Sequence, residues 1–107
     1  MSAIIYNVTI NVDESIHDEW IKWMKEDHIP KMLNTGKFHK ALMSEVLVNE
    51  EMGGVTYSIQ YTCRSRSVLD QYYNEEAGSM RQEGYQKFGD KFGAFRTELR
   101  VVEEFQS

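Results

Sequence analysis

Residues 20–36 read Trp-Ile-Lys-Trp-Met-Lys-Glu-Asp-His-Ile-Pro-Lys-Met-Leu-Asn-Thr-Gly, and the predicted arrangement of the other segments follows from them. This stretch is the end of an amphipathic helix whose apolar residues recur at helical spacing. These residues are Ile16, Trp20, Trp23 and Met24. Pro30 lacks an amide hydrogen, so we expect the helix to end near His28, with one more short turn before Gly36. The flanking segments must then supply a sheet for the apolar arc to cover.

Segments of alternating apolar and polar residues predict that sheet. They lie at 3–12, 55–65 and 94–105, and a strand at 38–48 has two partly apolar faces. In the segment 94–105 we expect Phe95 and Leu99 to face the helices and Arg96 to face away. A second helix is expected at 67–88, and Gly53 and Gly54 predict a turn at 49–54.

The predicted order is strand, helix, strand, repeated once. This order is typical of an α+β, ferredoxin-like βαββαβ fold. We expect a four-stranded antiparallel sheet with spatial order 4-1-3-2 and helices near 14–28 and 67–88 on one face. Residues 1–107 would form a single domain. The side chains expected between helices and sheet are Trp20, Trp23, Tyr57, Ile59, Tyr61, Tyr73, Met80 and Leu99.

Composition excludes several functional classes. The net charge is −5, which gives no help to binding a phosphate backbone, so no nucleic-acid partner is expected. No apolar run approaches the length of a membrane-spanning helix, so no membrane partner is expected either. The one cysteine, Cys63, excludes an internal disulfide and fits a reducing compartment. We therefore expect a soluble, cytoplasmic protein.

The face of the sheet without helices is expected to carry polar residues of three strands, among them Asn7, Gln60 and Arg96. Either set of alternating residues from 38–48 could add apolar side chains to it. Solvent could cover such a face, as in many antiparallel sheets. The apolar residues favour a homodimer in which two sheets face one another and line a polar cavity, a dimeric α+β barrel.

Five motifs stand out along the chain: Ile-Tyr-Asn-Val-Thr at 5–9, Trp-Ile-Lys-Trp-Met at 20–24, His-Ile-Pro at 28–30, Gly-Gly-Val-Thr-Tyr-Ser-Ile-Gln-Tyr at 53–61 and Lys-Phe-Gly-Ala-Phe-Arg-Thr at 91–97. With these motifs the chain, over about residues 3–103, resembles domain-of-unknown-function family 4286, a set of small bacterial proteins. The resemblance implies the dimeric α+β barrel class and no assigned activity. The His-x-Pro motif is also distantly similar to EthD-like proteins, which implies a binding or acid–base role for His28.

His28 and Arg96 are the candidate site residues with the most useful chemistry. His28 could cap the helix by bonding a carbonyl, or it could act as a general acid or base, since histidine titrates near neutrality. Arg96 could bind an anion, or it could pair with Glu98 or Glu45 across strands. Asn7 and Gln60 are further candidates for ligand binding.

No metal or cofactor is expected. His17 and His28 would lie about 16 Å apart on a helix, too far to share one metal ion, and no paired-ligand motif is present. The predicted second helix, 67–88, contains no histidine or cysteine that could bind haem iron.

Two functional hypotheses remain. The first is a homodimeric protein that binds a small hydrophobic or aromatic ligand without catalysis. The alternative is a cofactor-independent enzyme of the monooxygenase, cyclase or isomerase type that uses His28 as its general acid or base.

Overall fold

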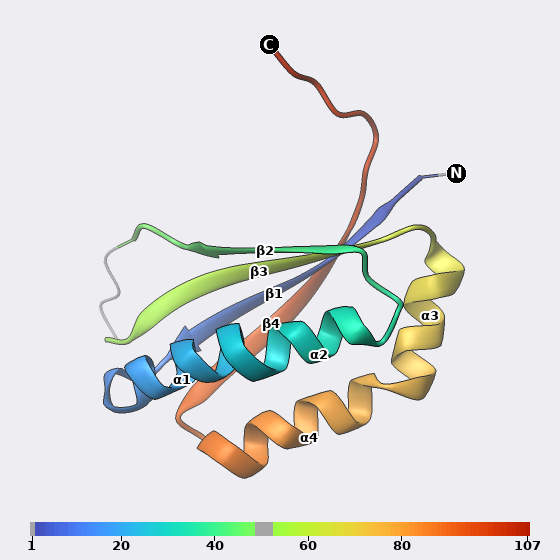
Figure 1. The fold of residues 1–107 in the computed structure, drawn as a ribbon. Helices are drawn as coiled ribbons and strands as arrows, with labels where there is room; N and C mark the ends of the chain where they lie inside the picture. The colour runs from blue at the N-terminus through green and yellow to red at the C-terminus, as the bar shows by residue number, and fades with distance from the viewer. Residues whose placement is uncertain (1, 49–52) are drawn as a thin grey trace.

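The computed structural model describes residues 2–48 and 53–107. Within them four antiparallel strands form one sheet: β1 Ile4–Val12, β2 Lys40–Glu45, β3 Val55–Cys63 and β4 Phe92–Arg100. Their order is β2-β3-β1-β4, as predicted from the alternating segments. The helices lie together on one side of this sheet (Figure 1). The ferredoxin-like arrangement is therefore confirmed, while part of the predicted turn, residues 49–52, lies outside the described residues.

The first helical segment does not end at Pro30, so that prediction was wrong. It consists of a 3-10 turn η1 Glu14–Ile16, helix α1 His17–Trp23, a π-helical turn η2 Met24–His28 and helix α2 Ile29–Asn34. In the π turn the amide of Ile29 bonds to the carbonyl of Met24, five residues earlier. The wider turn shifts the hydrogen-bond ladder, and Pro30 falls in the first turn of α2, where a missing donor is tolerated.

The second helical segment was predicted as one helix at 67–88 and is two. Helix α3 is Arg66–Glu75 and helix α4 is Ala77–Phe88. Glu76, between them, leaves the helical region with φ −125°. Its carboxylate pairs with Lys37, whose Nζ lies 2.8 Å away. A contact from a distant part of the chain therefore accompanies the kink.

The face assignment of β4 was also wrong. Arg96 pairs with Val8, whose side chain is buried under the helices, while Phe95 pairs with Thr9 on the opposite face. Phe95 is 64% exposed and Leu99 is 38% exposed. Phe92 and Ala94 pack toward the core instead. Alternation groups the residues of an edge strand into two sets, but it does not say which set faces inward.

The core lies between the sheet and the helices. Trp20, Tyr57, Ile59 and Tyr61 are buried there as predicted. Trp23, Tyr73 and Met80 are partly buried against the same core. On β2 the residues facing the helices are Ala41 and Met43, whose β3 partners are Tyr61 and Ile59, and Leu42 is 62% exposed on the other face.

The chain after β4 continues away from the sheet and the helices (Figure 1). Within it Val102 is 93% exposed and Phe105 is 82% exposed. In the described part of the chain, no helix is both long enough and apolar enough to cross a membrane.

Candidate functional site

Two arginines converge on one tyrosine at the edge of the core. The Tyr6 hydroxyl, from β1, accepts hydrogen bonds from Arg81 Nη2 at 3.2 Å and from Arg96 Nε at 3.1 Å. Arg81 belongs to α4 and Arg96 to β4. The Tyr6 ring is 2% exposed and stacks on Phe38 with centroids 6.0 Å apart. We call Tyr6, Arg81 and Arg96 the arginine–tyrosine cluster.

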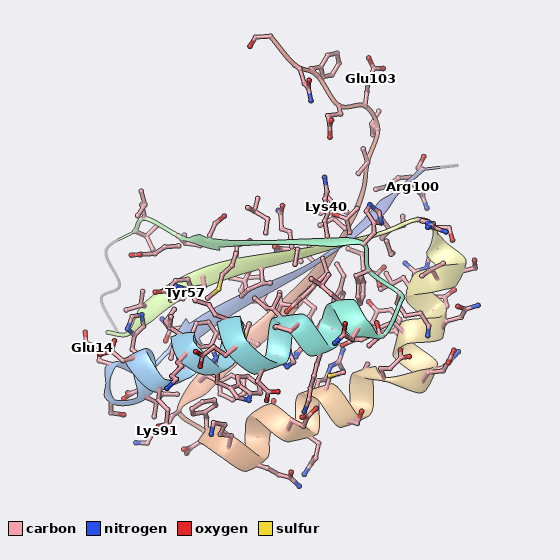
Figure 2. The ribbon with its side chains drawn as sticks, viewed as in Figure 1. Glu14, Lys40, Tyr57, Lys91, Arg100 and Glu103 are labelled. Atoms are coloured by element: carbon pink, nitrogen blue, oxygen red, sulfur yellow. The ribbon has the colours of Figure 1, made fainter. Side chains whose placement is uncertain are left out.

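This cluster borders a cavity of about 50 Å³ between the sheet and the helices. The side chains that fill this layer are drawn in Figure 2. Aromatic and apolar residues make up most of the cavity wall, and Arg81, Tyr85 and Arg96 are exposed lining residues that mark its mouth. The other lining residues are Tyr6, Val8, Ile10, Trp20, Trp23, Met24, His28, Met32, Tyr61, Tyr72, Met80, Gly84, Phe92 and Ala94.

His28 brings a neutral imidazole to the same cavity. It belongs to the π turn and stacks on Trp23, with ring centroids 4.7 Å apart and planes at 23°. Burial lowers the pKa of His28 to about 4. The carboxylates of Glu83 and Asp27 oppose this effect, and the positive charges of Lys31 and Arg96 add to it. At neutral pH the ring is therefore uncharged and able to accept a proton.

The capping alternative for His28 was wrong. The residue lies inside a continuous helical segment, and among the described residues its buried Nδ1 atom has no hydrogen-bond partner. An unpartnered polar atom in a protein interior is uncommon, because it loses its hydrogen bond to water without replacing it. Proline after the histidine was a sound signal for irregular helix geometry, but the irregularity is a π turn.

Arg96 belongs to the site because the face of β4 that carries it turns toward the helices, which the sequence did not reveal. Arg96 was expected on the face of the sheet that no helix covers, called the bare face below. It lies instead on the face that the helices cover, and it donates a hydrogen bond to Tyr6. The pairing with Glu98 does not form, since that carboxylate accepts hydrogen bonds from Arg66 and Tyr73.

Sequence reasoning missed Arg81. The signal was its place on the buried stripe of α4, four residues after Ala77 and three before Gly84, where a basic residue is unusual. Both flanking residues are buried in the structure.

Asn7 and Gln60 do not join this cavity. They pair across β1 and β3 on the face opposite the helices. There Asn7 Oδ1 accepts a hydrogen bond from Ser58 Oγ at 2.7 Å, and Asn7 Nδ2 donates to Thr9 Oγ1 at 3.3 Å. The four candidate residues thus divide between two faces of the sheet. Their role in binding stays a prediction.

Other reactive groups lie elsewhere. Cys63 is buried, and burial raises the pKa of its thiol. In residues 2–48 and 53–107 no three side chains of histidine, cysteine, aspartate or glutamate gather into a group that could hold a metal ion.

Solved structures share this fold at low sequence identity. One is described as a dimeric ferredoxin-like protein from an uncultured marine organism, with TM-score 0.72 and 14% identity, covering 98% of this chain and 100% of that one. An EthD family protein from Bacillus halodurans has TM-score 0.63 and 10% identity, with coverage of 95% and 99%. Hydroxynitrile lyase from Passiflora edulis has TM-score 0.59 and 14% identity, with coverage of 96% and 97%. At these identities the likeness establishes the fold alone.

Sequence comparison gives the family. No curated protein matches the chain. The family described as Domain of unknown function (DUF4286) matches residues 3–102, which include all five motifs of the sequence resemblance. The chain therefore belongs to the DUF4286 family.

Proposed function

We propose that the protein is a homodimer that binds a small molecule in the cavity between the sheet and the helices. The observation that carries this proposal is the lining of the cavity, where aromatic walls meet His28, Arg81 and Arg96. Ligand sites typically combine apolar walls with a few convergent polar groups. A core built only for stability would have no reason to keep the Nδ1 atom of His28 buried and unpartnered.

The size of the cavity limits the ligand. Its volume is about 50 Å³. Drug-sized ligands occupy pockets of roughly 300–1,000 Å³, and benzene occupies a cavity of about 150 Å³. A ring can therefore enter only if lining side chains move. Met80 and Tyr85 are suited to this, because methionine is flexible and Tyr85 is 55% exposed at the mouth.

The homodimer would use the bare face of the sheet. Leu42 and Phe95 are 62% and 64% exposed on that face, and a protein of the same fold is described as dimeric. Two sheets packed face to face would remove these side chains from water, which is favourable in proportion to the apolar area buried. Asn7 and Gln60 would then lie at the seam between the sheets, and any part they have in binding would be there.

A ligand screen with a blocked cavity tests the binding proposal. A Cβ atom at Gly84 would lie 3.4 Å from Phe92 Cζ and 3.7 Å from Trp23 Cη2, so the larger side chain of Gly84→Leu should fill the cavity. The matched control is Gly78→Leu in the same helix, where a Cβ atom would meet nothing within 4 Å. Small aromatic compounds should raise the melting temperature of the wild type and of Gly78→Leu, and should leave that of Gly84→Leu unchanged.

Two results would contradict the proposal. One is a wild-type protein that no compound stabilises. The other is a ligand that stabilises Gly84→Leu as much as Gly78→Leu, because that ligand would bind elsewhere.

A second candidate function is favoured by the state of His28. The imidazole of His28 lines the same cavity as the guanidinium of Arg96 and is unprotonated at neutral pH, so it can accept a proton from a bound substrate, as a weak base whose pKa is about 4. Such an enzyme would be a cofactor-independent monooxygenase, cyclase or isomerase. A protein of the same fold is a hydroxynitrile lyase, so the fold supports chemistry in at least one case.

Turnover of the screened ligands tests the enzymatic alternative. If His28 is the general base, kcat/KM should fall as the pH drops through about 4, where the imidazole of the free protein becomes charged. His28→Gln should lower turnover by about 10²–10⁴-fold. Turnover that is equal in the wild type and in His28→Gln would exclude this role.

A further inference from the structure

The arginine–tyrosine cluster favours a ligand with a negative charge. We propose, building on the proposed function, that the cavity binds an aromatic carboxylate with a single ring, and that Arg81 and Arg96 hold its carboxylate group. This inference assigns a binding role to Arg81 and a chemical class to the ligand.

Arg81 and Arg96 both keep most of their hydrogen-bond donors unused within the described residues. A guanidinium has five N–H donors, and Arg81 and Arg96 each spend one on the Tyr6 hydroxyl. Among the described residues these are the hydrogen bonds that the two side chains make, and neither forms an ion pair. Arg66 shows the contrast, because it pairs with both Asp70 and Glu98. The cluster therefore presents two guanidiniums with free donors at the mouth of a cavity.

The positive charges of the cluster also favour an anionic ligand. Arg81 and Arg96 place two positive charges around the Tyr6 hydroxyl, and these like charges repel each other. Among the described residues no carboxylate pairs with either guanidinium to offset this repulsion. The charge of Arg96 is also felt by His28, where it contributes to lowering the pKa after burial. A ligand carboxylate would neutralise part of this charge and accept hydrogen bonds from the N–H groups of both guanidiniums. Charge-assisted bonds of this kind are about twice as strong as neutral ones.

The lining and size of the cavity favour a single aromatic ring as the apolar part of the ligand. The walls that adjoin the cluster are aromatic, with Trp23, Tyr72 and Phe92 among them. Aromatic rings pack well against such walls in stacked or edge-on arrangements. At about 50 Å³ the cavity is already smaller than the roughly 150 Å³ that one benzene ring needs. A single ring is therefore the largest flat group that modest side-chain movement could admit.

A purely structural role is the competing explanation. Tyr6 could simply tie α4 to β4 through its two hydrogen bonds, with no ligand involved. In that case the arginines would matter for stability and not for binding. The two explanations differ in whether the affinity for an anion depends on the arginines.

The experiment compares benzoate with benzamide, its neutral counterpart of nearly equal shape. Each is titrated into the protein of residues 1–107 and followed by amide chemical shifts in NMR spectra. We expect benzoate to bind at least ten-fold more tightly than benzamide. Arg81→Gln and Arg96→Gln should each weaken benzoate binding about ten-fold and change benzamide binding less than two-fold. The control, Arg64→Gln, removes an exposed arginine outside the cavity and should change neither.

The outcomes separate this inference from the proposed function. If benzamide binds in the cavity as tightly as benzoate, the carboxylate inference is wrong and the binding function stands. If Arg81→Gln and Arg96→Gln lower the melting temperature but leave benzoate affinity unchanged, the cluster is only a structural tie. If neither compound nor any other in the screen binds the wild type, the proposed function fails as well.

Discussion

His28 is the residue at which stability and function diverge most clearly. It buries a nitrogen without a partner and stacks on Trp23. A buried polar atom without a hydrogen bond costs roughly 1–3 kcal/mol. Proteins tolerate such costs at binding sites, where a ligand supplies the missing partner.

Protonation of His28 should destabilise the fold. The folded pKa is about 4, below the ordinary value of 6.5, so the unfolded chain binds a proton more readily. The free energy of unfolding is therefore independent of His28 protonation well above pH 6.5, and it falls as the pH drops from 6.5 toward 4, by about 3 kcal/mol in all. Urea denaturation of the wild type and of His28→Leu between pH 7 and 4 checks this, because other titrating groups cancel in the difference. Parallel pH profiles would contradict it.

Replacing His28 by leucine should stabilise the protein at pH 7. His28→Leu removes the unpartnered nitrogen and keeps an apolar contact with Trp23, so we expect the free energy of unfolding to rise by about 1 kcal/mol. The control, His39→Leu, changes an exposed histidine and should shift stability by less than about 0.5 kcal/mol. Both values come from urea denaturation at pH 7. A less stable His28→Leu would mean that the imidazole makes a favourable contact.

The residues of the site were only partly predictable. His28 stood out because proline follows it, and Arg96 because a guanidinium binds anions. Their convergence with Arg81 and Tyr6 depends on the face of β4 that turns inward, and alternation leaves that choice open. The apolar side chains of Phe95 and Leu99 suggested the wrong face of β4. Apolar residues in a sequence do not show whether they face the core or lie on an exposed surface.

At the scale of elements, local signals located the helices and strands but not their irregularities. The π turn η2 and the kink at Glu76 were both missed. Helical periodicity is insensitive to one widened turn, and the kink has no proline or glycine at its centre. Its ion pair with Lys37 joins residues 39 apart in the chain, and such pairs are invisible to local patterns.

The start of β3 depends on a glycine that any side chain would strain. Gly54 has φ +82°, and a Cβ atom there would lie 2.8 Å from the carbonyl oxygen of Val12 at the end of β1. Gly53 has φ +84° but open space around it. We expect Gly53→Ala to cost about 1 kcal/mol from backbone strain alone. Gly54→Ala should cost at least about 1 kcal/mol more, because the clash is with backbone.

Chemical denaturation of the two glycine variants, compared with the wild type, checks this difference. Equal losses of stability would show that Gly54 does not need to approach β1 so closely.

At the scale of the whole molecule, the topology was predictable in full. Three cleanly alternating segments and two helical stripes leave few ways to cover one face of a sheet, and the observed order β2-β3-β1-β4 is the predicted one. Burial of the central strands was predictable for the same reason. What would cover the opposite face in the proposed homodimer is a property of two chains, so one sequence could only suggest it.

Disrupting the bare face should separate the proposed homodimer without unfolding its subunits. Phe95→Glu places a charge on an exposed side chain of that face, so the subunit loses little packing of its own. The control, Gln86→Glu, adds the same charge to an exposed position on α4. Light scattering should give twice 12.6 kDa for the wild type and the control, and 12.6 kDa for Phe95→Glu. A wild type that is already monomeric would contradict the dimer proposal.

The two tryptophans of the chain, Trp20 and Trp23, both line the cavity. All of the indole fluorescence of the protein therefore originates at the candidate site, and His28 is stacked on one of its two sources. Light emission should report whether the cavity is occupied and whether the imidazole is charged, with no dye and no label. Quenching by an added compound would locate that compound at the site, even before its chemical identity is known.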